Sequence, residues 1–124
     1  MNKQNDWFNL IYVETKKERT TETLFHTYSQ FAAVSNIPPK PSEDERSTEM
    51  KLQEILEKRE TLISQLSRLL DSDSSLTASA TRQNNLTRHR EILLDHRREL
   101  SRIRSSISEA RNRANLLSNK RIIC

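Results

Sequence analysis

Apolar residues recur every three or four positions between Thr81 and Ser118, which is the spacing of one face of an α-helix. No glycine or proline interrupts this segment, so nothing within it breaks or kinks a helix. The pattern therefore predicts one long helix over 81–118 with a narrow packing seam. The seam consists of Leu86, His89, Leu93, His96, Leu100, Ile103, Ile107 and Leu117, with Ala110 and Ala114 at the two intervening positions.

A second helical pattern covers 42–71. Ser42 and Glu45 have the spacing of a capping box, which marks a helix start. Its seam is formed by Leu52, Ile55, Arg59, Leu62, Leu66 and Leu69. Three prolines in 35–41 predict a stiff connector before this helix, and the polar residues 72–80 predict a loop after it.

The first segment, 1–34, is the weakest of the three helical predictions. Its second half has Leu24, Tyr28 and Phe31 on one face, but the stretch 14–18 offers no apolar residue to bury, and we expect a frayed start. Short connections of this kind join antiparallel neighbours. The sequence thus predicts an all-α fold, an antiparallel three-helix bundle whose first helix is the least certain, with a tail over 119–124.

The amino-acid composition argues against most kinds of catalytic and cofactor-binding site. Glycine is absent, so there is no phosphate-binding loop, nucleophile elbow or dinucleotide motif. His89 and His96 would lie two turns apart, about 10 Å along the helix, which is too far for one zinc ion. We therefore expect no catalytic, metal or cofactor-binding residues. With a mean hydropathy of −0.84, only a thin core between helices is possible.

Charge is distributed unevenly along the chain. Residues 1–80 carry 10 basic and 13 acidic side chains, whereas residues 81–124 carry 11 basic and 4 acidic ones. Within the third helix, four arginines each follow a seam position and form a basic shoulder. We take these arginines, Arg90, Arg97, Arg104 and Arg111, as a candidate protein-binding surface. Binding to nucleic acid or to anionic membrane lipid remains the alternative, although no aromatic residue accompanies the arginines.

The third segment also carries a family resemblance. LTRHREILLDH (Leu86–His96) and RIRSSISEARNRANLL (Arg102–Leu117), together with Trp7, Leu10 and YSQFA (Tyr28–Ala32), resemble the N-terminal region of the Golgi SNAP receptor complex member 1 family. These are Golgi SNAREs of the Q type. The resemblance implies a three-helix N-terminal domain (Habc-like) and a part in vesicle fusion and in ER–Golgi and intra-Golgi transport. It implies no cofactor.

The resemblance also bears on partners and location. It implies binding to other SNAREs and to tethering or SNARE-regulatory proteins at the cytosolic face of the Golgi membrane, with packing and surface roles for His89–Leu93, Asp95 and His96. The family continues into a SNARE motif and a membrane anchor, neither of which follows Ser118 in this sequence. We therefore expect a regulatory or interaction domain truncated before the SNARE motif, which alone would be cytosolic.

Overall fold

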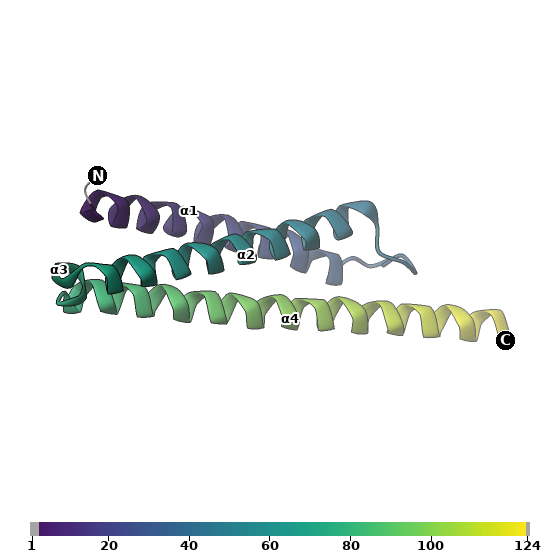
Figure 1. Cartoon of the computed structure of the whole chain (residues 1–124). Helices are drawn as coiled ribbons and strands as arrows, with labels where there is room; N and C mark the ends of the chain where they lie inside the picture. Colours follow the sequence, from purple (N-terminus) through teal and green to yellow (C-terminus); the bar gives the residue numbers. More distant parts are fainter. Residues whose placement is uncertain (1–2, 124) are drawn as a thin grey trace.

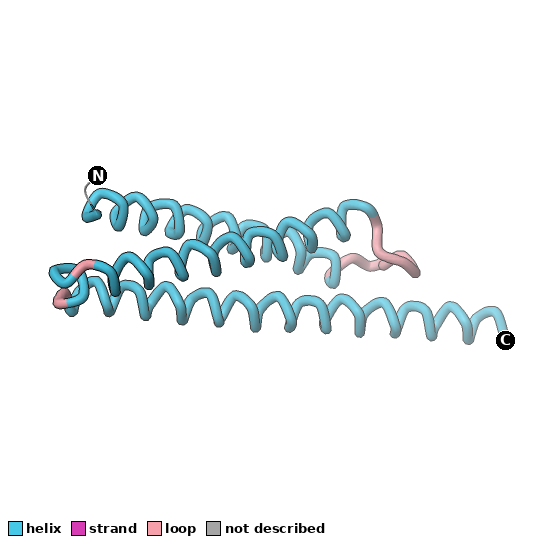
Figure 2. Tube along the Cα trace, viewed as in Figure 1, coloured by secondary structure: helices cyan, strands magenta, loops and turns pink. Residues whose placement is uncertain are grey.

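The chain folds into three long helices that lie side by side, in a computed structural model that describes residues 3–123 (Figure 1). The elements in chain order are α1 (Lys3–Ser29), the short 3₁₀-helix η1 (Gln30–Ala32), α2 (Glu43–Ser72), α3 (Ser74–Thr77) and α4 (Ala80–Ile123). Figure 2 shows loops only at the two ends of the bundle, and the described residues contain no strand. The predicted all-α bundle is confirmed.

Helix boundaries differ from the sequence predictions in understandable ways. The α2 helix begins at Glu43, because the Ser42 side chain caps it by accepting a hydrogen bond from the Glu45 backbone N–H at 3.1 Å. The predicted loop 72–80 contains the single turn of α3. At the other end, α4 continues to Ile123. Residues 119–123, which we expected to form a tail, are therefore helical, and Cys124 lies outside the described residues.

The core is a single apolar cluster along the axis of the bundle. Leu52, Leu56 and Leu66 of α2 are at most 1% exposed and form its centre. The α1 helix contributes Trp7, Phe25 and Tyr28, and α4 contributes Leu86, Leu93, Leu100, Ile103 and Ile107. In this arrangement most of the seam positions predicted for the third helix are buried, with His89 buried and His96 half-buried.

The prediction that Leu117 belongs to the seam is wrong. Its side chain is 58% exposed. The reason lies in the length of α4: Arg111 pairs with Glu45 in the first turn of α2, so the next turns of α4 have no α2 residues beside them. Figure 1 shows this end of α4 projecting beyond the other helices.

The first half of α1 is helical despite its polar sequence. Three polar side chains from the first half and the middle of α1, Glu14, Glu18 and Thr21, are all buried. Buried polar groups need partners. The α2 and α4 helices supply these partners, which makes this part of the bundle the most unusual region of the structure.

Candidate functional site

Arg59 of α2 is the centre of a buried polar layer across all three long helices. Its side chain is 0% exposed. Its Nε donates to Glu14 Oε2 at 2.9 Å, and its Nη1 donates to Thr21 Oγ1 at 3.1 Å. The same Nη1 lies 2.7 Å from Nδ1 of His96 on α4. Since a guanidinium only donates, this imidazole nitrogen accepts, and His96 is neutral with its proton on Nε2.

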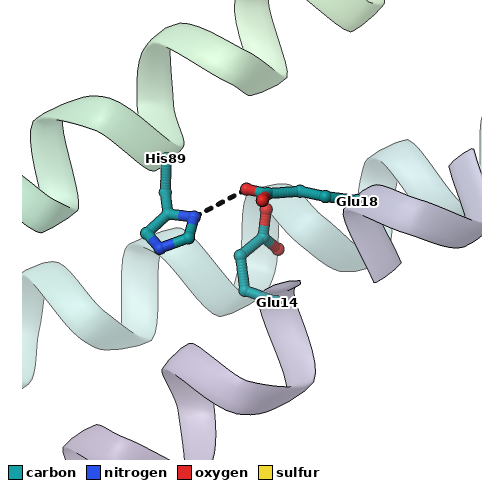
Figure 3. A group of neighbouring side chains, drawn as sticks. All are labelled: Glu14, Glu18 and His89. Atoms are coloured by element: carbon teal, nitrogen blue, oxygen red, sulfur yellow. Dashed lines mark hydrogen bonds and ion pairs between the residues drawn. The ribbon is translucent and has the colours of Figure 1, made fainter. Parts of the chain in front are cut away.

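His89 of α4 closes the other side of this layer. Its Nδ1 donates to Glu18 Oε2 at 2.6 Å, and Figure 3 shows the Glu14 and Glu18 carboxyl groups next to each other at this point. The α1 helix presents both carboxyl groups to the core because residues four apart lie on one helix face. We call Glu14, Glu18, Thr21, Arg59, His89 and His96 the polar layer.

The polar layer shifts the pKa values of Glu14, Glu18 and His96. Burial raises the pKa of Glu14 to about 7, against the opposing effect of the Arg59 charge, and the Glu18 carboxylate raises it further. Burial also raises the pKa of Glu18, but the hydrogen bond and charge of His89 outweigh it, so the net shift is downward. Burial and the Arg59 charge lower the pKa of His96. One acid of the pair therefore holds its proton more tightly than the other.

Three members of the layer have the donor set of a metal site. One donor atom each from Glu14, Glu18 and His89 lies within 4.8 Å of the others. The expectation of no metal ligands considered only residues near each other in the sequence, so it did not include this group. However, the guanidinium of Arg59 already lies against these carboxylates and supplies their positive charge. A divalent ion would have to share the pocket with this cation, so the residues do not fit a metal.

The four arginines of the basic shoulder all reach across to α2 or to the connector. Arg90 donates to Ser67 Oγ at 2.9 Å, and Arg97 pairs with Glu60. Arg104 donates to Glu49 Oε1 at 3.1 Å. Arg111 pairs with Glu45 at 2.5 Å and donates to the Pro38 carbonyl at 3.0 Å.

The four arginines differ in how far these contacts bury them. The Arg111 side chain is only 12% exposed, so the idea that it is an exposed binding residue is wrong. The sequence around Arg111 gives no sign that the start of α2 lies beside it, so the pattern predicted a surface position for this residue. Arg90 and Arg97 are exposed and line a groove between α2 and α4, whose floor includes Ile63, Leu93 and the half-exposed Leu94. Arg90 and Arg97 are the two exposed arginines of the predicted surface, whereas Arg104 is half-buried with 37% of its side chain exposed.

A membrane anchor is not among the described elements. No helix within residues 3–123 combines the length and the apolar character needed to cross a bilayer.

Comparison with known proteins gives the chain its family. Residues 12–123 match the model of the GOSR1 N-terminal domain. Golgi SNAP receptor complex member 1 of Saccharomyces cerevisiae is 39% identical over 100 residues, which cover 81% of this chain and 43% of that protein. The match thus spans less than half the length of this relative, and no solved structure matches the chain. The chain belongs to the family of the GOSR1 N-terminal domain.

Proposed function

We propose that this chain is the N-terminal interaction domain of a Golgi SNARE that acts in vesicle fusion and in ER–Golgi and intra-Golgi transport. The observation that carries the proposal is the family match over residues 12–123, on a chain that folds as a three-helix bundle. A SNARE N-terminal domain works by recognition, and its partners would be other SNAREs and tethering or SNARE-regulatory proteins at the cytosolic face of the Golgi membrane.

The groove between α2 and α4 is the surface we assign to this recognition. It combines an apolar floor with Arg68, Arg90 and Arg97 on its rim. Arginine next to exposed apolar surface is the composition of binding hot spots. Glu60 is the one acidic residue among those lining the groove, and it is already paired with Arg97. The groove therefore favours partners that present acidic and apolar side chains together.

The same pairing argues against nucleic acid as the ligand of this shoulder. Three of its arginines are bridged to glutamates of α2, so a phosphate would have to displace a carboxylate at each. Phosphate-tracking surfaces rely on cations that are free to release counterions. A protein partner that contacts the apolar floor and Arg90, which donates to the Ser67 hydroxyl, displaces no carboxylate there.

The proposal can be tested by capturing Golgi SNAREs from detergent-solubilised Golgi membranes on the immobilised chain. The double variant Arg90→Glu, Arg97→Glu should reduce capture at least about tenfold, as expected for the loss of hot-spot arginines. The matched control is Arg98→Glu, Arg102→Glu, which changes the same number of charges at exposed positions of α4 paired only within their own helix. Circular dichroism should show all three proteins equally helical.

A chimera tests the cellular role. The matching region of the yeast relative is replaced by this chain, and transport from the endoplasmic reticulum to the Golgi is measured. The proposal predicts Golgi localisation and restored transport. A chimera that is stable and correctly located but leaves transport blocked, or equal capture by wild-type and groove variants, would contradict it.

A further inference from the structure

The outer side of α1 carries aromatic and basic side chains without an exposed carboxylate between residues 7 and 21. Phe8 and Tyr12 are each 59% exposed and stand one helical turn apart. Lys16 and Arg19 continue the same side of the helix and are exposed. The only acidic residues in this stretch are Glu14 and Glu18, and both are buried.

The polar layer is what makes this surface basic. In the sequence, the stretch Glu14–Glu18 balances two acids against two lysines and reads as neutral. In the bundle, Arg59 and His89 hold both carboxyl groups inside the core. The solvent therefore meets the lysines of this stretch but not its acids.

The basic groups lie directly beside the aromatic rings. Lys16 Nζ lies 4.9 Å from the centroid of the Tyr12 ring. Arg82, from the first turn of α4, has its Cζ 5.8 Å from the centroid of the Phe8 ring. We call Phe8, Tyr12, Lys16, Arg19 and Arg82 the aromatic–basic face. Figure 1 shows why two helices contribute to it: α1 and α4 both begin at the same end of the bundle.

We propose that the aromatic–basic face binds the surface of an anionic lipid bilayer. Tyrosine is favoured at the depth of the lipid headgroups, and phenylalanine is common on the apolar side of helices that lie in this interface. Basic residues next to them are attracted by anionic lipids, and a helix with this composition lies flat in the interface. From Phe8 to Arg19 the face extends about 16 Å along α1, enough to contact several headgroups.

The shape of the face favours a bilayer over a protein or a nucleic acid. Phe8, Tyr12 and Lys16 are exposed along the outer surface of one helix. A fluid bilayer surface can adapt to a helix surface of this kind, whereas a folded partner would need a matching groove. The face ends at Arg19, which lines a hollow between α1 and α4 together with Glu22 and Asp95. Their charges would be repelled if the contact extended further.

Binding in this way leaves the bundle closed. The absence of aromatic residues from the α4 seam argued against a membrane contact through that helix. The α1 helix supplies the aromatics instead, with the seam still buried. The inference stands independently of the proposed SNARE function, because it depends only on this surface.

The test is co-sedimentation of the whole chain with vesicles of phosphatidylcholine alone and of phosphatidylcholine mixed with phosphatidylserine. Binding should require phosphatidylserine and should weaken as salt rises. The variant Lys16→Glu, Arg19→Glu should weaken it at least about thirtyfold, the effect of losing two cations near the membrane surface. The variant Phe8→Ala, Tyr12→Ala should also weaken it, because burial of the rings is lost.

Matched controls lie on α2. Lys51→Glu, Lys58→Glu makes the same change in net charge at two exposed lysines, and Met50→Ala removes a side chain that is 58% exposed. Both controls should bind anionic vesicles as the wild type does. A nitroxide attached at Tyr12→Cys, in a Cys124→Ser background, should report a position within the headgroup region.

Several results would overturn the inference. These are equal binding to both kinds of vesicle, equal weakening by the Lys51 and Lys58 control, or no effect of the aromatic substitutions. Failure to bind vesicles while polyglutamate or RNA binds through Lys16 and Arg19 would assign the face to a different class of partner. Fluorescence of the buried Trp7 confirms that each variant is folded before these comparisons are made.

Discussion

Replacing Arg59 by methionine should be among the most destabilising single changes in this protein. The guanidinium is fully buried and is 2.9 Å from Glu14, 3.1 Å from Thr21 and 3.9 Å from Glu18. Methionine keeps much of the aliphatic stem and removes the charge and the hydrogen bonds. The consequence is a pair of buried carboxyl groups with His89 as their remaining basic partner in the layer.

The expected cost follows from breaking a buried ion pair. Removing one partner of such a pair costs about 3–5 kcal/mol, because the other charge stays buried without compensation. Domains of this kind are stable by about 5–15 kcal/mol in total, so Arg59→Met should remove a large part of the stability. The cost should be greatest near pH 8, where Glu14 is ionised, and smaller near pH 5, where Glu14 is protonated and no longer needs the cation.

Urea unfolding followed by circular dichroism at pH 8 and pH 5 measures this. The second variant is Glu14→Leu, Arg59→Met, which removes both partners and should recover at least about half of the loss, since an apolar pair can replace a buried ion pair at little cost. Recovery stays incomplete because His96 Nδ1 loses its donor. A loss below about 1 kcal/mol for Arg59→Met at pH 8, or a double variant no more stable than the single, would refute the reasoning.

Three further predictions concern stability. Native Glu14 keeps its proton up to a pKa of about 7, whereas the unfolded carboxyl loses it near 4.5, so its contribution is complete below pH 4.5 and is lost as the pH rises to 7. Glu14→Gln should therefore gain stability relative to wild type over this interval, by at most roughly 3 kcal/mol in urea titrations, and a constant difference would contradict this. Leu93→Ala should lower the free energy of unfolding by about 2–5 kcal/mol and Leu117→Ala by less than about 0.5 kcal/mol, because only Leu93 is buried. Thermal unfolding distinguishes the two variants, and equal losses of stability would argue against the exposed end of α4. Ser42→Ala should cost about 1 kcal/mol in the same assay through loss of the α2 cap, and an unchanged midpoint would show that the cap contributes nothing.

The fold was predictable because apolar residues recur at helical spacing along its two longest helices. Leu86, Leu93 and Leu100 recur every seven residues and are all buried. Helix ends were less predictable, since they depend on neighbours. Leu117 continues the other seven-residue series of the seam, through His89, His96, Ile103 and Ala110, and only the position of the α2 start relative to α4 shows why it is largely exposed.

The polar layer could not be predicted because its members are far apart in the sequence. Glu18 and His89 are separated by 71 positions, and Glu14 and Arg59 by 45. The one local signal was Arg59 at a seam position of α2, where a leucine would be usual. A charged residue within an apolar seam requires buried partners, and the carboxylates of an otherwise unexplained polar helix are the natural ones to look for.

One feature of α1 therefore has two consequences. Glu14 and Glu18 are spaced to face the core together, where they meet Arg59 and His89. Inside the bundle they favour one alignment of α1 against α2, because a shift by one residue would bury a carboxylate without its cation. On the outer surface of α1, the burial of these two carboxylates leaves Lys16 beside exposed aromatic rings. A substitution at Glu14 that keeps a carboxylate in the core should alter stability alone. Any change that turns the Glu14 or Glu18 side chain to the surface should also weaken the basic character of α1.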